Sequence, residues 1–121
     1  MVLGLFFFSS SAYAEWTRVA VNINGDTYYV DFENIRVEGK LIYYWELMKY
    51  GVPEKDGTSS HKIYQVIDCN NFSSKPLRFI FYSDRNATSD PDSQKSLINE
   101  WTQYPPDSVA MKSAKKLCKN I

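Results

Sequence analysis

His61 is the only histidine in this 121-residue sequence, and it is the side chain best suited to act as a general base near neutral pH. Ser59, Ser60, Asp56 and Asp68 lie close enough in sequence to be its partners in a hydrolytic site. His61 stands where a polar loop meets a predicted strand, and there an exposed histidine without a catalytic role is the commoner outcome. We therefore predict that the protein is not an enzyme and rank a small hydrolase based on His61 last among the functional alternatives.

Acidic side chains gather in the loop that contains Asp84, Asp90 and Asp92, which raises the question of a calcium site. A calcium loop of the EF-hand type requires glycine at its sixth position and glutamate at its twelfth. Counting from Asp90, these positions hold Lys95 and Trp101, and counting from Asp84 fails in the same way. One histidine and two cysteines are also too few for most zinc sites or for a haem site. We predict no bound metal and no cofactor.

The first 14 residues have the pattern of an export signal. Residues 2–8 are an uncharged apolar run, and Ala12-Tyr13-Ala14 places small residues where signal peptidase requires them. The run is too short for a membrane anchor, which needs about 20 apolar residues, so we predict no transmembrane segment. No Lys or Arg precedes the run, and we expect the true start to lie upstream. Residues 1–14 are thus predicted to be a signal peptide, residues 15–121 one domain, and the location the bacterial periplasm or cell surface.

Export would place Cys69 and Cys118 in an oxidising compartment, where two cysteines usually form a disulfide. The alternative is a reactive thiol pair, which is disfavoured because the sequence contains no Cys-x-x-Cys motif. By chain entropy, a crosslink that closes a loop of about 50 residues stabilises a fold by about 4 kcal/mol. A disulfide would therefore supply a large share of the stability of so small a domain.

Alternating polar and apolar residues, typical of half-buried β-strands, recur along most of the chain. Asn24-Gly25-Asp26 and Glu38-Gly39-Lys40 predict tight turns, the first of them joining the strands of a hairpin. The polar stretches 51–60 and 84–93 predict loops, of which we expect the second to be mobile. Residues 97–104 fit either a short strand or an irregular segment. The predicted strands are 16–23, 27–31, 41–50, 62–69 and 77–83.

Residues 107–120 form the one predicted helix, with cap residues at its start and an apolar face. Cys118 lies on that apolar face, and Cys69 ends a strand on the face shared by Ile63 and Ile67. A helix that packs on this sheet face brings the two cysteines together, which predicts a disulfide between sheet and helix. The predicted fold class is α+β: a single, mainly antiparallel sheet of five or six strands with one C-terminal helix packed across it. The apolar face consists of Ala110, Ala114, Leu117, Cys118 and Ile121.

Lysine and arginine number 14, and aspartate and glutamate also number 14, so the formal net charge is zero. A nucleic-acid binder needs a strong basic excess, so we predict no nucleic-acid partner. The predicted helix nevertheless carries a stripe of lysines away from its apolar face, which is a candidate site for an anionic glycan or an acidic protein. The alternative, favoured by the zero net charge, is a solvated helix face whose cations complement the helix dipole. The stripe consists of Lys112, Lys115, Lys116 and Lys119.

Aromatic residues occupy both faces of the strand predicted at 41–50. Tyr43 and Trp45 point one way, and Tyr44 and Tyr50 point the other. Because one helix covers only one face of a sheet, we predict a protein-binding or self-association surface on the face opposite the helix, and we assign Tyr44 and Tyr50 to it. The alternative is an ordinary half-buried sheet whose tyrosine hydroxyls reach solvent.

Several short motifs follow one another in a distinctive order. Trp16 comes directly after Ala-x-Ala, and further motifs then occur at Tyr28-Tyr29-Val30-Asp31, Ile35, Trp45-Glu46-Leu47-Met48, Ile67-Asp68-Cys69, Trp101, Pro105-Pro106-Asp107-Ser108 and Cys118-Lys119. This order resembles the surface-adhesin protein E family of small exported bacterial proteins, over nearly the whole mature chain. The resemblance implies a single antiparallel sheet with a helix tied to its concave side by a disulfide, at positions that match Cys69 and Cys118. It also implies adhesion to host extracellular-matrix or plasma proteins, often as a homodimer.

These predictions describe an exported, non-catalytic binding protein of the bacterial envelope, with adhesion to host matrix or plasma proteins as the implied role. The expected partner is a protein or an anionic glycan, with a homodimer as the expected form of self-association. The alternative is a periplasmic structural or interaction component that has no adhesive role.

Overall fold

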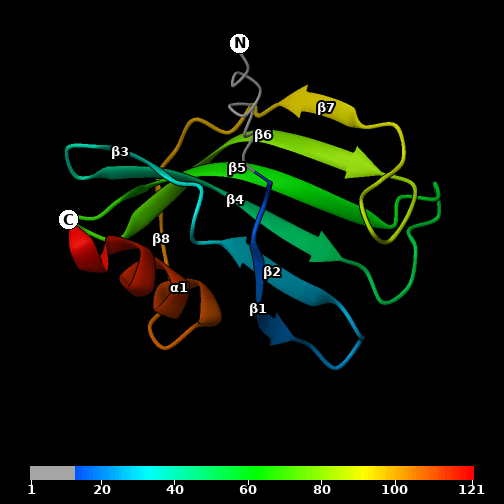
Figure 1. The fold of residues 1–121 in the computed structure, drawn as a ribbon, viewed down its shortest axis with the longest axis horizontal. Coiled ribbons are helices and arrows are strands. Elements are labelled where there is room, and N and C mark those ends of the chain that lie inside the picture. Colours follow the sequence, from blue (N-terminus) through cyan, green and yellow to red (C-terminus); the bar gives the residue numbers. More distant parts are fainter. Residues whose placement is uncertain (1–12) are drawn as a thin grey trace, which may run out of the picture.

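The computed structural model describes residues 13–121, so the predicted signal peptide lies outside the described residues except for Tyr13 and Ala14. Within the described range, eight strands form one antiparallel sheet, with the order β1-β2-β4-β5-β6-β7 along its main path (Figure 1). β3 pairs with β4, and β8 pairs with β6. The strands are β1 (Trp16–Val21), β2 (Thr27–Asp31), β3 (Arg36–Glu38), β4 (Leu41–Lys49), β5 (Ser60–Asp68), β6 (Ser73–Tyr82), β7 (Asp92–Lys95) and β8 (Thr102–Gln103).

The helical part of the chain is C-terminal, as predicted, but shorter than the predicted 107–120. Helix α1 spans Val109–Leu117 and continues into the 3₁₀ turn η2, Cys118–Asn120. The helix starts at Val109 because Ser108 caps it, its hydroxyl accepting a hydrogen bond from the Met111 N–H at 3.1 Å. Pro105 and Pro106 precede the cap and cannot supply the backbone donors of an earlier turn.

The α+β class is confirmed, whereas the predicted number of five or six strands was too small. The additional strands β3, β7 and β8 have two to four residues each, and all of their residues are exposed. Segments this short and polar show no alternation, because only backbone pairing with a neighbouring strand holds them. β7 also begins inside the loop predicted at 84–93, where Asp92 pairs with Phe81.

Strand β6 begins at Ser73, four residues before the predicted start at Leu77. Pro76 lies inside this strand, and a proline cannot donate to the ladder, which makes the segment look like a turn in the sequence. The structure accommodates Pro76 at a shift in the pairing register between β5 and β6, next to Gln65. Such an irregularity lets the sheet continue past a residue that has no N–H.

The hydrophobic core lies between α1 and the sheet face that α1 covers, which we call the helix face. Val30, Ile42, Tyr44 and Ile67 from the sheet pack there with two residues of the helix region, Ala114 and Leu117. The predicted disulfide joins Cys69, directly after β5, to Cys118, directly after α1, with 5.8 Å between the Cα atoms. It therefore fastens the C-terminal end of α1 to the sheet beside this core.

Candidate binding surface

The sheet face opposite α1, which we call the open face, is defined by the pairing register, because directly paired residues point to the same side. One row across the sheet contains Trp45, Tyr64, Arg78 and Lys95. Flanking rows contain Leu47, Lys62 and Ile80 on one side and Tyr43, Val66 and Lys75 on the other. The open face thus carries aromatic and cationic side chains in adjacent positions.

Tyr44 does not belong to the open face, so the prediction that placed it opposite the helix was wrong. Its side chain is 1% exposed and packs in the core beneath α1. Its hydroxyl donates a hydrogen bond to Glu46 Oε2 at 2.6 Å. Tyr50 follows β4, and its hydroxyl is 2.6 Å from His61 Nδ1, on the helix face as well. The alternation along β4 was predicted correctly, but the wrong face was assigned to the helix. Tyr43 and Trp45, not Tyr44 and Tyr50, face away from the helix.

Aromatic rings and cations of the open face contact one another. The Arg36 guanidinium carbon lies 4.0 Å from the centroid of the Tyr43 ring. The Lys62 ammonium lies 5.8 Å from the Trp16 ring and 5.2 Å from the Tyr82 ring. Each of these distances is within the range of cation–π attraction. The Arg36 and Lys62 cations are therefore held over the rings of the open face.

A groove of about 400 Å³ opens among these side chains, and we call it the aromatic groove. The Trp45 and Tyr64 ring centroids are 4.8 Å apart, and those of Tyr43 and Tyr64 are 6.2 Å apart. The mutual packing fixes the rings, so a partner would lose little side-chain freedom on contact with them. The groove is lined in particular by Trp16, Arg36, Tyr43, Trp45, Lys62 and Tyr64.

The open face carries a local excess of positive charge although the chain as a whole is neutral. The strands paired across it hold seven cations on this face, whereas Asp31, Glu38 and Asp68 are the acidic residues there. Glu38 forms an ion pair with Arg36 at 2.8 Å, which offsets one of these positive charges. The zero net charge of the chain therefore does not hold for this face taken alone, because folding brings these cations to one side of the sheet. The seven cations are Arg18, Arg36, Lys49, Lys62, Lys75, Arg78 and Lys95.

The lysine stripe of α1 and η2 lies on a different surface. Lys112, Lys115, Lys116 and Lys119 are all exposed, and α1 covers the face opposite the aromatic groove. Lys116 places its ammonium 4.3 Å from the Phe32 ring centroid, so part of its stem packs on the protein. The structure does not bring this stripe together with the open-face cations or with Tyr44 and Tyr50.

His61 is held in a structural environment. Its Nδ1 is paired with the Tyr50 hydroxyl, and its ring meets Phe81 edge-on at 6.1 Å between centroids. Burial lowers the pKa of His61, which keeps the imidazole neutral near pH 7. The Ser60 hydroxyl, the nearest candidate nucleophile, donates instead to the Asp84 carbonyl at 2.6 Å. These contacts do not form the serine–histidine relay that hydrolysis needs.

Asp84 organises the polar loop that follows β6. Its carboxylate accepts hydrogen bonds from the Thr88 hydroxyl and, at 2.9 Å each, from the Ser89 and Thr88 N–H groups. These bonds, the one from the Thr88 hydroxyl foremost, hold the pKa of Asp84 far below its usual range. Asp84, the first of the three acidic residues considered for calcium binding, therefore closes a turn. Among residues 13–121, no group of three or more His, Cys, Asp or Glu side chains is arranged to hold a metal ion.

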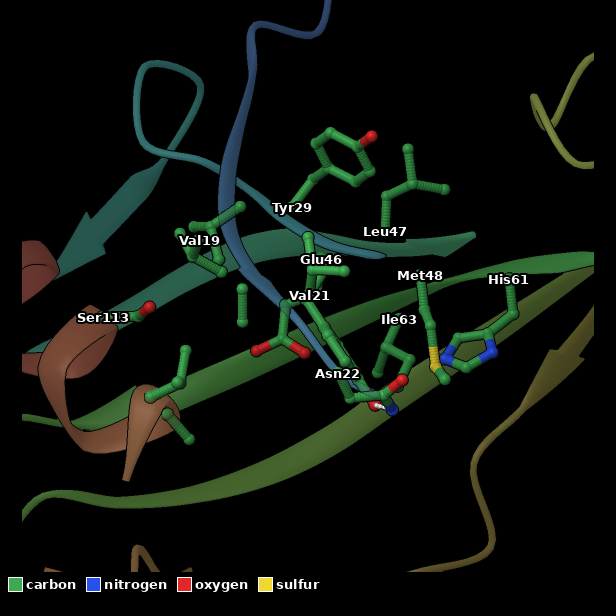
Figure 2. Close-up of a pocket in the computed structure, with 15 residues that line it drawn as sticks. Val19, Val21, Asn22, Tyr29, Glu46, Leu47, Met48, His61, Ile63 and Ser113 are labelled. Carbon is green, nitrogen blue, oxygen red and sulfur yellow. Dashed lines mark hydrogen bonds between the residues drawn. The ribbon is translucent and has the colours of Figure 1, made fainter. Parts of the chain in front are cut away.

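A second hollow, which sequence analysis did not predict, lies on the helix face between α1 and strands β1, β2, β4 and β5. This helix-side cavity has a volume of about 450 Å³ and mostly apolar walls (Figure 2). Glu46 lines it from β4, and burial raises the pKa of this carboxyl, although hydrogen bonds from Tyr44 and Gln65 lower it in part. The sequence signal for this cavity was Glu46 itself, a charged residue that shares one face of β4 with Ile42, Tyr44 and Met48.

Glu46 makes stability depend on pH. Because its folded-state pKa is raised, the folded chain binds more protons than the unfolded chain above pH 4.5, the ordinary pKa of a glutamate. The free energy of unfolding contributed by this group therefore falls as pH rises from 4.5 through the raised pKa. We expect Glu46→Gln to match the wild type near pH 4 and to exceed it in stability near pH 8, in urea denaturation at both values. Glu38→Gln, on an exposed side chain, should show no such gain, and equal pH profiles for Glu46→Gln and wild type would contradict the assignment.

Fold and surface together define a class of protein: a small antiparallel-sheet module, fastened to its C-terminal helix by a disulfide, that presents an aromatic and cationic face. The chain belongs to the surface-adhesin protein E family, whose family model matches residues 16–119. It is thus an adhesin-like surface protein of a family of adhesins rather than of enzymes, and membership implies an exported or cell-surface location. No helix within residues 13–121 is long and apolar enough to cross a membrane.

Two solved structures illustrate the likeness in fold. Crystal form II of Haemophilus influenzae protein E superimposes with a TM-score of 0.68 at 20% identity, covering 91% of this chain and 91% of that chain. Protein E from non-typeable Haemophilus influenzae gives a TM-score of 0.67 at 20% identity, covering 92% of this chain and 80% of that chain. No curated protein sequence gives a significant match.

Proposed function

We propose that this protein is exported as a non-catalytic adhesin and that it binds host extracellular-matrix or plasma proteins through the aromatic groove. Residues 1–14 would be removed on export, leaving residues 15–121 as the binding module. Support for this division comes from β1, which begins at Trp16, and from the family match, which begins at the same residue. The role is carried over from the family, whose description is that of a surface adhesin.

The observation that carries the proposal is the interleaving of rings and cations on the open face. Tyr, Trp and Arg are the residues that contribute most to binding energy at protein interfaces, and here Tyr43, Trp45 and Arg36 contact one another or share a groove. The surrounding lysines favour a partner that presents acidic groups. An acidic stretch of a matrix or plasma protein meets both requirements, and an anionic glycan is the competing partner that the assay must separate.

Paired charge reversals test the location of the site. We expect Lys62→Glu with Lys75→Glu, on the open face, to weaken binding to immobilised matrix and plasma proteins by about tenfold or more. Lys112→Glu with Lys115→Glu changes the net charge equally but on α1, and we expect it to leave binding unchanged. Surface plasmon resonance at two salt concentrations should show the open-face contribution fading at the higher one.

The outcomes of this assay separate the alternatives. If the α1 pair abolishes binding and the open-face pair does not, the site is the lysine stripe. Binding that disappears after the immobilised protein is stripped of its sulfated glycans indicates an anionic glycan as the partner. If no host protein binds and a bacterial envelope protein is captured instead, the protein is a periplasmic interaction component without an adhesive role.

The same face is proposed as the contact in a homodimer. Unpartnered rings on one sheet face can pair with their own copies across a twofold axis. Sedimentation of the Trp45→Ala variant beside the wild type tests this, since the variant should shift the equilibrium towards monomer. A wild type that stays strictly monomeric at high concentration excludes the dimer and leaves the adhesin proposal untouched.

A further inference from the structure

We propose that the helix-side cavity is a binding site for a small amphipathic cation, a molecule with an apolar chain and one protonated amine. This site is independent of the aromatic groove, because it opens on the other face of the sheet. The proposal rests on the size of the cavity, on its apolar walls and on one half-buried carboxylate without a lysine or arginine partner.

Size and lining fit a ligand with an apolar body. The volume of about 450 Å³ falls within the range of small-molecule sites, which are mostly apolar with a few polar groups. Val19 and Val30 line the cavity from β1 and β2. Met48 and Ile63 line the wall formed by β4 and β5 (Figure 2). Such a chamber would bury an aliphatic chain of several carbons.

Glu46 supplies the polar contact. It is the one carboxylate that lines the cavity, and no lysine or arginine lines it. His61 also lines it, but burial lowers the pKa of its imidazole and so disfavours a positive charge there. The Tyr44 hydroxyl donates a hydrogen bond to Glu46 Oε2. The ion pair found among the described residues joins Arg36 to Glu38 on the open face and does not involve Glu46. A carboxylate placed among apolar side chains gains strongly from a cation that comes within contact distance. A ligand with an ammonium group at the end of an apolar chain would pair with the carboxylate and pack its chain against the apolar walls.

The cavity has an apolar entrance. Val21 on β1 and Val109 at the start of α1 both line it, and they are 53% and 43% exposed. The disulfide holds α1 at its opposite end, at Cys118, so the entrance lies at the end of the helix that is not covalently fastened. A chain-like ligand would enter here with its apolar part against the two valines and its amine directed inward to Glu46.

Ligands that match in length and differ in head group test the proposal. Octylamine, octanol and octanoate are titrated separately into the folded protein near neutral pH, below their aggregation concentrations, with binding followed by calorimetry and by amide chemical shifts. We expect octylamine to bind about tenfold or more tightly than octanol, and octanoate to bind most weakly, because its charge repels Glu46.

Variants assign the effect to the cavity and to its carboxylate. Glu46→Gln should lose the preference for octylamine, so that octylamine and octanol bind with similar affinities, while the far-ultraviolet spectrum stays native. Glu38→Gln on the open face should keep the preference. Ala110→Trp should fill the entrance and abolish binding of all three ligands while the far-ultraviolet spectrum stays native.

Three results would overturn the proposal. They are equal affinities of octylamine and octanol for the wild type, an amine preference that survives Glu46→Gln, and no binding of any of the three ligands. A dimer that Ala110→Trp converts to monomer would show that a second copy of the chain occupies this surface, which also overturns it. None of these outcomes bears on adhesion through the aromatic groove.

Discussion

Replacing Cys69 and Cys118 together by serine should lower the free energy of unfolding by about 4 kcal/mol, the largest loss we expect from changes outside the core. The crosslink spans 49 residues in sequence, and without it the unfolded chain regains the conformational freedom of that loop. A domain of this size has a total stability of about 5–15 kcal/mol, so the variant would be only marginally folded at 37 °C. Urea denaturation of the oxidised wild type and the variant measures the difference.

The loss should be concentrated at α1. This helix has nine residues, and isolated helices shorter than about 12 residues are marginal in water, so α1 depends on its packing and its covalent link. Reduction of the wild type with dithiothreitol should reproduce the instability of the serine variant, whereas the variant itself should not respond to the reductant. Equal denaturation midpoints for oxidised wild type and variant would show that packing alone holds the helix.

The pairing of Cys69 with Cys118 was predictable because two independent periodicities agreed on it. The helical repeat put Cys118 on the apolar face with Ala114 and Leu117, and the strand alternation put Cys69 on the face of Ile67. Each pattern is local, and local periodicity is the structural feature most readily predicted from a single sequence. The hairpin at Asn24-Gly25 was predictable for the same reason, since Gly25 adopts a positive φ of 85° that suits it to the turn.

The face exchange on β4 shows what local patterns cannot supply. Ile67 was correctly placed on the helix face, and in the structure it pairs directly with Ile42, which shares its face with Tyr44. That register would have placed Tyr44 under the helix, but it is set across a ten-residue connection between β4 and β5, and nothing in the alternation of either strand fixes it. With aromatic residues on both faces of β4, hydrophobicity could not decide between them.

The charge of the open face was hidden for a related reason. A net charge of zero is a sum over the chain, whereas a partner meets the charges of one face. Lys62, Lys75 and Arg78 come from neighbouring strands and become a cluster only when the strands pair in register. The acidic residues Asp56 and Asp84, which balance them in the sum, lie in loops after β4 and β6. The separation of these cations from the acidic residues therefore results from the order in which the strands pair in the sheet.

Truncation of two neighbouring tyrosines should therefore lower the free energy of unfolding by very different amounts. Tyr44→Ala empties a fully buried core position and removes the hydrogen bond to Glu46, so we expect a loss of about 3–5 kcal/mol in the free energy of unfolding. Tyr43→Ala removes a half-buried ring on the open face, and we expect a loss of about 1 kcal/mol from its contacts with Arg36 and Tyr64. Urea denaturation of both variants gives the comparison.

Binding to the host protein should depend on these two positions in the reverse order, with the larger loss at Tyr43. Tyr43→Ala removes a ring that lines the aromatic groove, and it should weaken attachment to the immobilised host protein by about tenfold while the protein stays folded. Tyr44→Phe, which keeps the ring in the core but removes the hydroxyl, should leave attachment unchanged at temperatures where it is folded, because Tyr44 does not reach the open face. A binding loss in Tyr44→Phe that equals that of Tyr43→Ala would mean that the partner contacts the helix face, and would move the adhesive site away from the aromatic groove.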